Sequence, residues 1–197
     1  MKFHRVHATS IATDKATKVE ERFAEVFNGE LGELPGEAHL LVEKEVQPTV
    51  LPPRRLPHAI KHKVKAELDR MVERDVIAAV HKPTNWVSQL VVAEKKNGDL
   101  RICIDPRPLN KALKREHYPL PVIEDILPDL NQAQIFSKLD MSSAFWQVRL
   151  DESSSNLTTF NTPFGRYRWR RLPFGTIAYP RKSSSEDCIK HLKDCQG

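Results

Sequence analysis

Three features are scarce in this 197-residue chain: cysteine, long apolar runs and internal repetition. An odd, low count of three cysteines gives no disulfide framework and favours a reducing compartment. The N-terminus holds no apolar core of signal-peptide length, and no stretch approaches the roughly 20 apolar residues that span a bilayer. Neither a repeat nor a heptad pattern is visible. We therefore expect a soluble intracellular protein, cytoplasmic or nuclear, that is neither secreted nor membrane-spanning.

Charge is abundant in both signs but unevenly distributed. Lysine and arginine number 31 against 26 acidic residues, which gives a net charge of +5 and a pI near 9.1. This balance is weak support for a polyanionic partner such as nucleic acid. The chain is acidic from Glu21 to Glu45, whereas basic residues dominate from Arg54 to Arg115. The net charge is therefore a difference between two segments of opposite sign.

The first 46 residues carry weak structural signals. Residues 1–18 are polar without a clear period, so we expect a disordered or loosely attached arm. A short helix is predicted over residues 18–27, with Phe23 and Phe27 on one side. Residues 39–46 alternate loosely and are compatible with a strand.

Prolines lead the chain into a long helix. Four prolines between residues 48 and 57 force an extended path, which a plain linker would also show. From Pro57 to Asp75 the spacing predicts an amphipathic helix that begins at a proline. Its apolar side is formed by Ile60, Val64, Leu68, Met71 and Val72. Its basic residues occupy other faces, which by itself is typical of a solvated surface.

Residues 87–105 give the clearest local signal. Two β-rich runs, VSQLVVAEKK and DLRICID, are joined at Asn97-Gly98. This pattern predicts a hairpin with a type I′ turn. Lys95 and Lys96 precede the turn and Arg101 follows it, so cations gather at one rigid tip.

Downstream, short helices and strands alternate irregularly. The patterns predict a helix at 121–130 and strands at 135–139, 158–161 and 167–172, while residues 145–150 fit strand or helix equally. With at least one antiparallel hairpin, the fold class is α+β, or mixed α/β.

Asp140 is the most informative carboxylate. It ends an apolar strand and precedes the small residues Ser142, Ser143 and Ala144. A carboxylate placed there can face a cleft that a metal ion and a phosphate enter, although a lone strand-end aspartate is more often a cap or turn residue. Nucleotidyl transfer uses paired metal ions, which need at least two convergent carboxylates.

Longer runs of residues carry a family resemblance. Residues 136–175 are similar to the palm of Ty3/gypsy-type retrotransposon reverse transcriptases, in the run FSKLDMSSAFWQVRLDESSSNLTTFNTPFGRYRWRRLPFG. Residues 87–127 resemble the fingers of the same enzymes, in VSQLVVAEKKNGDLRICIDPRPLNKALKREHYPLPVIEDIL. Residues 51–77, LPPRRLPHAIKHKVKAELDRMVERDVI, look like the segment that leads into those fingers. The resemblance covers roughly residues 20–175 and implies a right-hand polymerase architecture.

The resemblance implies roles for individual residues. Asp140 matches the first catalytic aspartate, which binds magnesium in the family, with help from the Met141 carbonyl. Phe145 matches the aromatic residue under the incoming sugar, where a flat ring leaves no room for a 2′-hydroxyl. By pattern alone Phe145 is a core aromatic.

Other matches concern phosphates and the nucleic-acid backbone. Arg101 matches the fingers arginine that contacts the triphosphate, and Lys95 or Lys96 matches its lysine partner. Phe174 and Gly175 match the loop beside nucleotide and template. The alternating basic and aromatic residues after Gly165 place cations on one side of a strand, which suits backbone contact but also a solvated edge. These cations are Arg166, Arg168, Arg170 and Arg171.

The family's second carboxylate cluster, an aromatic-x-Asp-Asp turn, does not occur in residues 176–197. Glu186-Asp187 is the only acidic pair there and lacks a preceding apolar strand. Because the resemblance ends at Gly175, we expect a frameshift or changed exon junction near codon 176. Cys188, His191 and Cys195 share one possible helical face and are a weak candidate zinc set.

The expected organisation has four parts: an arm and linker (1–45), a fingers-like region (46–120), a partial palm (121–175) and a divergent tail (176–197). The resemblance implies a magnesium-dependent enzyme that acts on a primer–template and deoxynucleoside triphosphates. We expect this chain to be an N-terminal fragment that is inactive alone. The alternatives are a non-catalytic nucleic-acid-binding remnant and a chain that does not fold stably.

Overall fold

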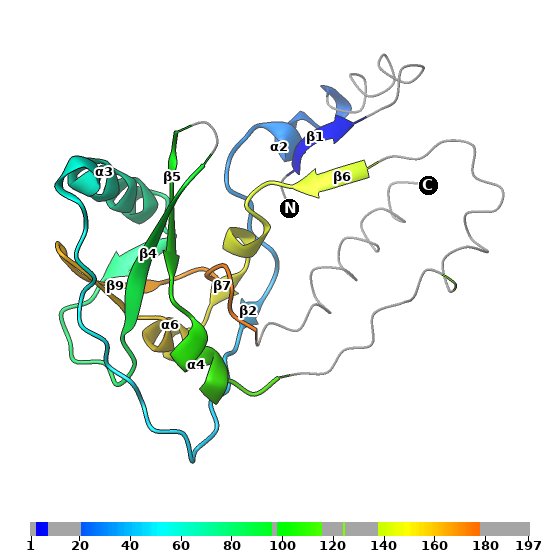
Figure 1. Ribbon diagram of the computed structural model, residues 1–197. Coiled ribbons are helices and arrows are strands. Elements are labelled where there is room, and N and C mark those ends of the chain that lie inside the picture. The colour runs from blue at the N-terminus through cyan, green and yellow to red at the C-terminus, as the bar shows by residue number, and fades with distance from the viewer. Residues whose placement is uncertain (1–2, 8–20, 96–97, 116–123, 125–137, 178–197) are drawn as a thin grey trace. The chain divides into compact units, whose positions relative to one another are not determined.

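The computed structural model describes residues 3–7, 21–95, 98–115, 124 and 138–177. The chain divides into two compact units. The first comprises residues 1–33, 117–144 and 180–197, and the second comprises residues 34–116 and 145–179. Figure 1 shows the elements of both units. Among the described residues, no helix is long and apolar enough to cross a membrane.

The described part of the first unit is a two-stranded antiparallel ribbon with a short helix. Strand β1 (Phe3–His7) pairs with β6 (Lys138–Met141), in a register that joins Phe3 to Met141 and His7 to Lys138. Helix α2 (Ala24–Phe27) lies within the helix predicted for 18–27, of which residues 18–20 lie outside the described residues. The expected disordered arm is wrong for residues 3–7, because a strand more than 130 residues away supplies the backbone partners that the local sequence lacks.

Five strands form the sheet of the second unit, in the order β3-β9-β8-β4-β5. The bounds are Ile77–Ala79 for β3, Ser88–Glu94 for β4, Leu100–Ile104 for β5, Phe160–Thr162 for β8 and Gly165–Trp169 for β9. The pair β4–β8 is parallel and the other pairs are antiparallel. Two chain segments therefore build one sheet, since β8 and β9 return from residues 160–169 to strands at 77–104.

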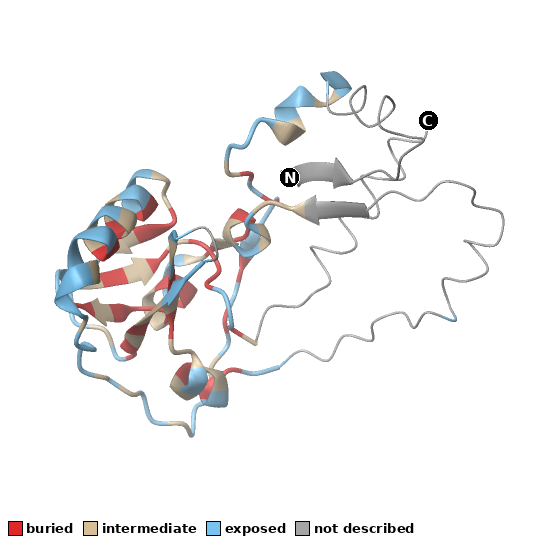
Figure 2. Ribbon diagram, turned by 45° about the horizontal axis from the view of Figure 1, so that its top comes forward, coloured by how far each residue is buried: buried red, intermediate tan, exposed pale blue. Residues whose placement is uncertain are grey.

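Helix α3 (His58–Glu73) confirms the helix predicted from Pro57 to Asp75. Val64, Leu68 and Met71 are fully buried, whereas Val72 remains 42% exposed. In Figure 2 the buried side of α3 faces the sheet and its other side is exposed. Burial of each such side chain stabilises the fold by about 2 kcal/mol. The sheet contributes the other buried side chains of this core, among them Ile77, Leu90, Ile102, Ile104, Phe160 and Trp169.

Helix α3 ends in a turn that an aspartate closes. The Val76 N–H donates to Met71 O (2.9 Å) and the Asp75 N–H donates to Val72 O (3.0 Å), which is a Schellman motif. Asp75 has a φ of +56°, a left-handed conformation usually occupied by glycine or asparagine. Val76 and Met71 are both fully buried beside this turn.

The remaining described elements are short. Helix α4 (Arg107–Ala112) follows β5, and α6 (Glu152–Leu157) is capped by the Asp151 side chain. Strand β2 (Glu37–Ala38) runs parallel to β7 (Arg149–Leu150). The 3-10 helix η1 (Ala144–Gln147) precedes β7, so residues 145–150 contain both helix and strand.

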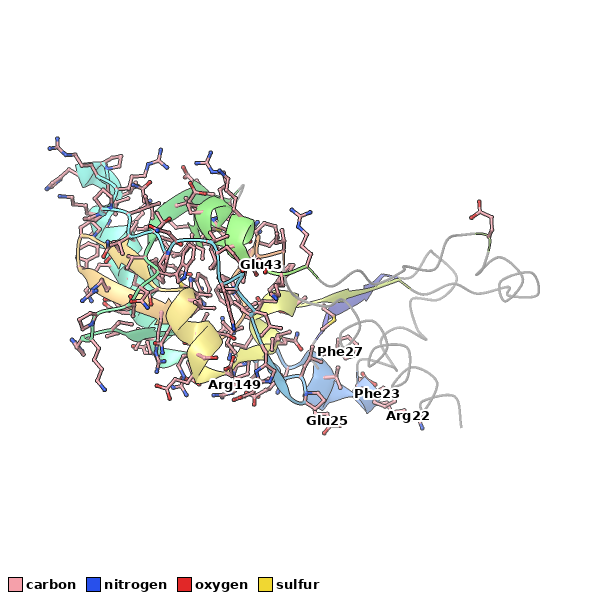
Figure 3. The ribbon with its side chains drawn as sticks, turned by 90° about the horizontal axis from the view of Figure 1, so that it is seen from below. Arg22, Phe23, Glu25, Phe27, Glu43 and Arg149 are labelled. Atoms are coloured by element: carbon pink, nitrogen blue, oxygen red, sulfur yellow. The ribbon has the colours of Figure 1, made fainter. Side chains whose placement is uncertain are left out.

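The strand considered for residues 39–46 is wrong. Val42 makes only an isolated bridge with Leu113, and the Glu43 N–H donates to Ala112 O at 2.8 Å. Glu43, labelled in Figure 3, also pairs with Lys114 at 3.4 Å. The segment thus lies irregularly along the end of α4, where its backbone partners come from a helix terminus instead of a sheet.

The other strand predictions hold with shifted bounds. Strand β8 begins two residues after the start predicted at 158, and β9 begins at Gly165, two residues before 167. The helix predicted at 121–130 and residues 135–137 lie outside the described residues, apart from Glu124. The α+β class is confirmed by a mixed architecture of helices and two-, two- and five-stranded sheets among the described residues.

Candidate functional site

Asp140 lies in β6 of the first unit. Its neighbours in the strand pair with β1, Leu139 with Val6 and Met141 with Phe3. Within the described ranges, no group of three or more His, Cys, Asp or Glu side chains could hold a metal ion. The described residues therefore do not form a complete metal site. Glu186-Asp187 and the set Cys188, His191 and Cys195 lie outside the described residues.

The predicted basic hairpin is confirmed in the second unit. Strands β4 and β5 pair with Ala93 opposite Arg101, and the Lys95 N–H donates to Asp99 O at 2.8 Å. Because side chains alternate along a strand, Lys95 lies on the same face of the hairpin as Arg101. Both side chains are exposed. The two described phosphate-binding candidates thus share one face, and Lys96 lies outside the described residues.

The predicted type I′ turn is wrong. The hydrogen bond that closes the turn runs from the Gly98 N–H to Lys95 O at 2.9 Å, so Gly98 is the last residue of the turn. Gly98 has a φ of +83°. A glycine in this left-handed conformation after a closed turn is typical of a three-residue hairpin loop with a bulge. Lys95 consequently pairs across the ladder with Asp99.

Two exposed phenylalanines and Arg101 come together in the second unit. The rings of Phe145 and Phe174 meet edge to face, with centroids 5.3 Å apart and an interplanar angle of 85°. The Arg101 guanidinium lies over the Phe174 ring, 5.8 Å from its centroid. Phe145 is 39% exposed and Phe174 54%, so neither ring is a core residue. An exposed flat ring beside an exposed cation can stack on a base or sugar and attract a phosphate.

The loop that carries Phe174 is held by Asn110 of α4. The Asn110 Nδ2 donates to Gly175 O at 2.9 Å, and the Ile177 N–H donates to Asn110 Oδ1 at 3.2 Å. Gly175 has a φ of +94°, and a Cβ there would lie 3.3 Å from Pro106 Cγ. The backbone conformation and the close approach both require glycine. The Phe174-Gly175 loop is therefore fixed against α4 from both sides.

The four arginines near β9 occupy different environments. The Arg168 guanidinium donates to Asn156 Oδ1 at 3.2 Å and lies 3.5 Å from Glu152. Arg171 is only 7% exposed, and its Nη1 donates to Trp146 O at 3.0 Å. Among the described residues, the half-buried Arg166 has no side-chain hydrogen bond or ion pair. The sequence pattern predicts the same role in nucleic-acid contact for all four arginines. Their surroundings in the fold differ, and Arg166 is the most available for a ligand.

Asp75 gathers three arginines at the end of α3, two of the four near β9 and Arg149 of β7. Its carboxylate pairs with Arg170 Nη1 at 2.5 Å and with Arg149 Nη2 at 3.3 Å, while its carbonyl accepts from Arg171 Nε at 3.4 Å. Arg149 is labelled in Figure 3. The helix terminus thus ties β7 and the residues after β9 to α3. A single aspartate orients cations that stand up to 96 residues away in the sequence.

Sequence reasoning missed Asn110 and Asp75. Asn110 stands in an unremarkable basic stretch, and only its two hydrogen bonds to residues 175 and 177 reveal its role. Asp75 does carry a local signal, because it follows a predicted helix end where a left-handed residue is common. Its arginine partners carry no such signal.

The Asp105 carboxylate, just after β5, is held by Arg107. The Arg107 guanidinium and backbone N–H hydrogen-bond to Asp105 and keep the pKa of that carboxyl below its ordinary value. On the same strand, burial raises the pKa of the Cys103 thiol, and the nearby Arg101 lowers it in part. A raised pKa lowers the thiolate fraction of Cys103 and hence its reactivity as a nucleophile.

The sequence of the chain is similar to a known protein family and to curated proteins of that family. Residues 93–180 match the family described as reverse transcriptase (RNA-dependent DNA polymerase). The chain is 37% identical over 143 residues to the retrovirus-related Pol polyprotein from transposon 412 of Drosophila melanogaster, a match that covers 70% of this chain and 11% of that protein. With the polyprotein from transposon 297 of the same organism, identity is 31% over 144 residues, covering 71% and 13%.

Solved structures share the fold. The foamy viral protease-reverse transcriptase dRH in complex with double-stranded DNA has a TM-score of 0.73 and 19% identity, covering 94% of this chain and 33% of that chain. The foamy viral enzyme in complex with RNA/DNA hybrid has a TM-score of 0.67 and 17% identity, covering 95% and 26%. The chain thus spans about a tenth of the transposon polyproteins and up to a third of these solved chains. Residues 93–180 belong to the reverse transcriptase family, and the chain is homologous to one segment of retrovirus-related Pol polyproteins.

Proposed function

We propose that the second unit binds a primer–template and a deoxynucleoside triphosphate, as the fingers and first palm segment of a Ty3/gypsy-type reverse transcriptase. The observation that carries this proposal is the exposed group of Arg101, Phe145 and Phe174. The cation is positioned for a phosphate and the rings for the sugar and base. Gly175 and Asn110 fix the loop, so the group is preorganised for its ligand.

Lys95 and Arg166 complete the proposed ligand contacts. Lys95 shares the hairpin face of Arg101 and supplies a second cation for the triphosphate, together with Lys96. Arg166 supplies a backbone contact to nucleic acid from β9. Arg168, Arg170 and Arg171 support the same surface by fixing α6, β7 and α3 to β9 and the residues that follow it. Similar structures in complex with DNA and RNA/DNA hybrid support the choice of ligand.

Asp140 is proposed as one carboxylate ligand of magnesium. Transfer through two metal ions needs at least two convergent carboxylates, and the 197 residues contain no aromatic-x-Asp-Asp sequence. We therefore propose that a polypeptide of these residues binds its ligands but does not polymerise by itself. Primer extension with the purified chain tests this point. Template-dependent incorporation would contradict it.

Binding is tested with a labelled nucleotide in equilibrium dialysis, in the presence of a primer–template. Arg101→Ala is expected to weaken nucleotide binding at least tenfold, because it removes the cation over Phe174. Phe145→Ala is expected to reduce the preference for deoxynucleotide over ribonucleotide. The control is Lys111→Gln, which removes an exposed charge from α4. Equal affinity of Arg101→Ala and the control would refute the proposed nucleotide site.

A further inference from the structure

A dense group of exposed basic residues precedes and begins α3. No acidic residue occurs between residues 47 and 66, although the chain is 29% charged. All members of the group are exposed, and among the described residues none has a hydrogen bond or ion pair of its own side chain. We call them the α3 basic patch: Arg54, Arg55, His58, Lys61, His62 and Lys63.

The segment that carries the two arginines is fixed to the sheet. The Leu51 N–H donates to Val87 O at 2.9 Å, and Leu51 O accepts from Asn161 Nδ2 at 2.7 Å. Pro52 O accepts from Gln89 Nε2 at 3.2 Å. Neighbouring prolines restrict the backbone further. Arg54 and Arg55 therefore project from a preorganised segment, so little backbone entropy would be lost when they bind a ligand.

The helical part of the patch lies on the solvent side of α3. At 100° per residue, His58, Lys61 and His62 fall within one arc of about 100°, with Lys63 on the next flank. Leu68 lies only about 20° and Val64 about 60° from Lys61, so Lys61 stands at one border of the buried side of α3 and Lys63 near the other. Six basic residues within ten positions thus lead from the loop onto the exposed surface of the helix.

The position of these cations works against helix stability. The first turn of α3 contains no acidic residue, and Pro57 at its N-cap provides no side-chain hydrogen bond. The positive end of the helix dipole repels cations, so Lys61 and protonated His58 or His62 destabilise the helix. Farther along α3, Lys65 pairs with Asp69 and Arg70 with Glu67. Uncompensated cations at this end suggest a partner that brings negative charge.

We infer that the α3 basic patch binds the phosphodiester backbone of a nucleic acid, as a contact additional to those of the hairpin and β9. The inference rests on the proposed function, since it extends the nucleic-acid surface of the same unit. A basic patch without an exposed Phe, Tyr or Trp suits phosphates more than base edges. A membrane surface does not fit, because the apolar side of α3 is buried against the sheet. The charge of Arg54 also acts on the Asp105 carboxylate and contributes to lowering its pKa.

The test measures how salt affects affinity. Fluorescence anisotropy of labelled single-stranded and primer–template DNA is recorded with the full chain between 50 and 300 mM NaCl, roughly the range over which phosphate contacts weaken. The variant Lys61→Gln/Lys63→Gln removes two patch charges. Its matched control, Lys82→Gln/Lys111→Gln, removes two exposed lysines elsewhere. We expect the patch variant to reduce the slope of log K against log[salt] by about 1.4 to 1.8, and the control to change it little.

A second variant separates binding from folding. Lys61→Glu places a negative charge near the N-terminus of α3, where the helix dipole favours it. We expect its midpoint of thermal unfolding to equal or exceed that of the wild type, while its affinity for DNA falls more than that of Lys61→Gln. A loss of affinity in this variant cannot then come from unfolding.

The outcomes distinguish this inference from the proposed function. Equal salt slopes for patch and control variants, with nucleotide affinity still lost in Arg101→Ala, would refute the patch and leave the proposed function standing. No DNA binding by the wild type would refute both the patch and the proposed primer–template binding, while nucleotide dialysis would still report on the Arg101 site. Competition by polyglutamate as strong as that by DNA of equal charge would refute a nucleic-acid partner in favour of an acidic protein. Comparing the two labelled DNAs shows whether the patch takes single strands, duplex or both.

Discussion

Asn110 Nδ2 donates a hydrogen bond to the carbonyl of Gly175, 65 residues later in the chain, at 2.9 Å. The same side chain accepts from the Ile177 N–H at 3.2 Å. One amide thus satisfies a carbonyl and an N–H on either side of Thr176. This clamp holds the loop that presents Phe174 next to Phe145 and Arg101.

Replacement of Asn110 should loosen that loop. Asn110→Ala removes both hydrogen bonds and is expected to lower the free energy of unfolding by about 1 to 2 kcal/mol, measured with urea. Asn110→Asp keeps an acceptor for the Ile177 N–H but turns a carboxylate oxygen toward the Gly175 carbonyl, so its loss should be at least as large. The variants should also weaken nucleotide binding in dialysis. If Asn110→Asp were as stable as the wild type, the hydrogen bond to the Gly175 carbonyl would contribute nothing.

Replacement of Gly175 tests the close approach of α4. Gly175→Ala forces a side chain into a φ of +94° and places its Cβ 3.3 Å from Pro106 Cγ. We expect a loss of about 1 to 3 kcal/mol in unfolding free energy. The matched control is Gly36→Ala, where φ is +83° and no atom lies within 4 Å of the added Cβ. The difference between the two variants measures the contact with Pro106, and Pro106→Ala should reduce it.

At Asp75 the ion pairs of the side chain partly offset the conformational strain of the backbone. Its left-handed conformation disfavours a non-glycine residue by about 1 to 2 kcal/mol. Its partly exposed ion pairs with Arg149 and Arg170 contribute less, at most about 1 kcal/mol. Asp75→Gly removes the strain along with the ion pairs and should be close to wild type in urea unfolding, whereas Asp75→Ala keeps the strain, loses the ion pairs and should be destabilised by up to about 1 kcal/mol. Equal losses in both variants would mean that the carboxylate, and not the strain, decides.

The Asp151 cap of α6 predicts a dependence of stability on pH. Burial raises the pKa of Asp151, but hydrogen bonds from Ser153 and Ser154 outweigh burial and hold it below its ordinary value. Because the folded-state pKa is lowered, this stabilisation is complete above the unfolded-state value of about 3.9 and is lost as pH falls through the folded value. Asp151→Asn keeps a capping oxygen without the titrating charge.

The measurement is urea unfolding of wild type and Asp151→Asn at pH 7, 5 and 3. We expect the advantage of the wild type over the variant to be smaller at pH 3 than at pH 5, with little change between pH 7 and 5. An advantage that stayed constant down to pH 3 would show that the ionised carboxylate does not matter for α6. Asp151→Ala, which removes the cap, should lose about 1 kcal/mol at every pH above 4.

The periodicity of apolar residues predicted those helices and strands that depend only on residues close together in the sequence. The period of α3, the β-rich runs of the hairpin and the strand that contains Asp140 all follow from neighbouring residues, because side-chain periodicity depends only on local geometry. The Asn97-Gly98 dipeptide predicted a reversal but not the right turn, since pairing of Lys95 with Asp99 shifted the loop by one residue. The predicted four-part domain division stays a prediction.

Patterns along the chain were enough to predict the α+β class, the helix from Pro57, the basic hairpin and the resemblance to reverse transcriptases, a family that residues 93–180 match. The pairing of β8 and β9 into one sheet with β3 and β4, and the hydrogen bonds of Asn110 to the Gly175 loop, became visible only in the folded chain. The fold also shows which arginines are paired, since Arg170 pairs with Asp75 whereas Arg166 has no such partner among the described residues. The physical reason is that these relationships join residues 65 to 96 positions apart, where no local period or propensity carries information about the partner.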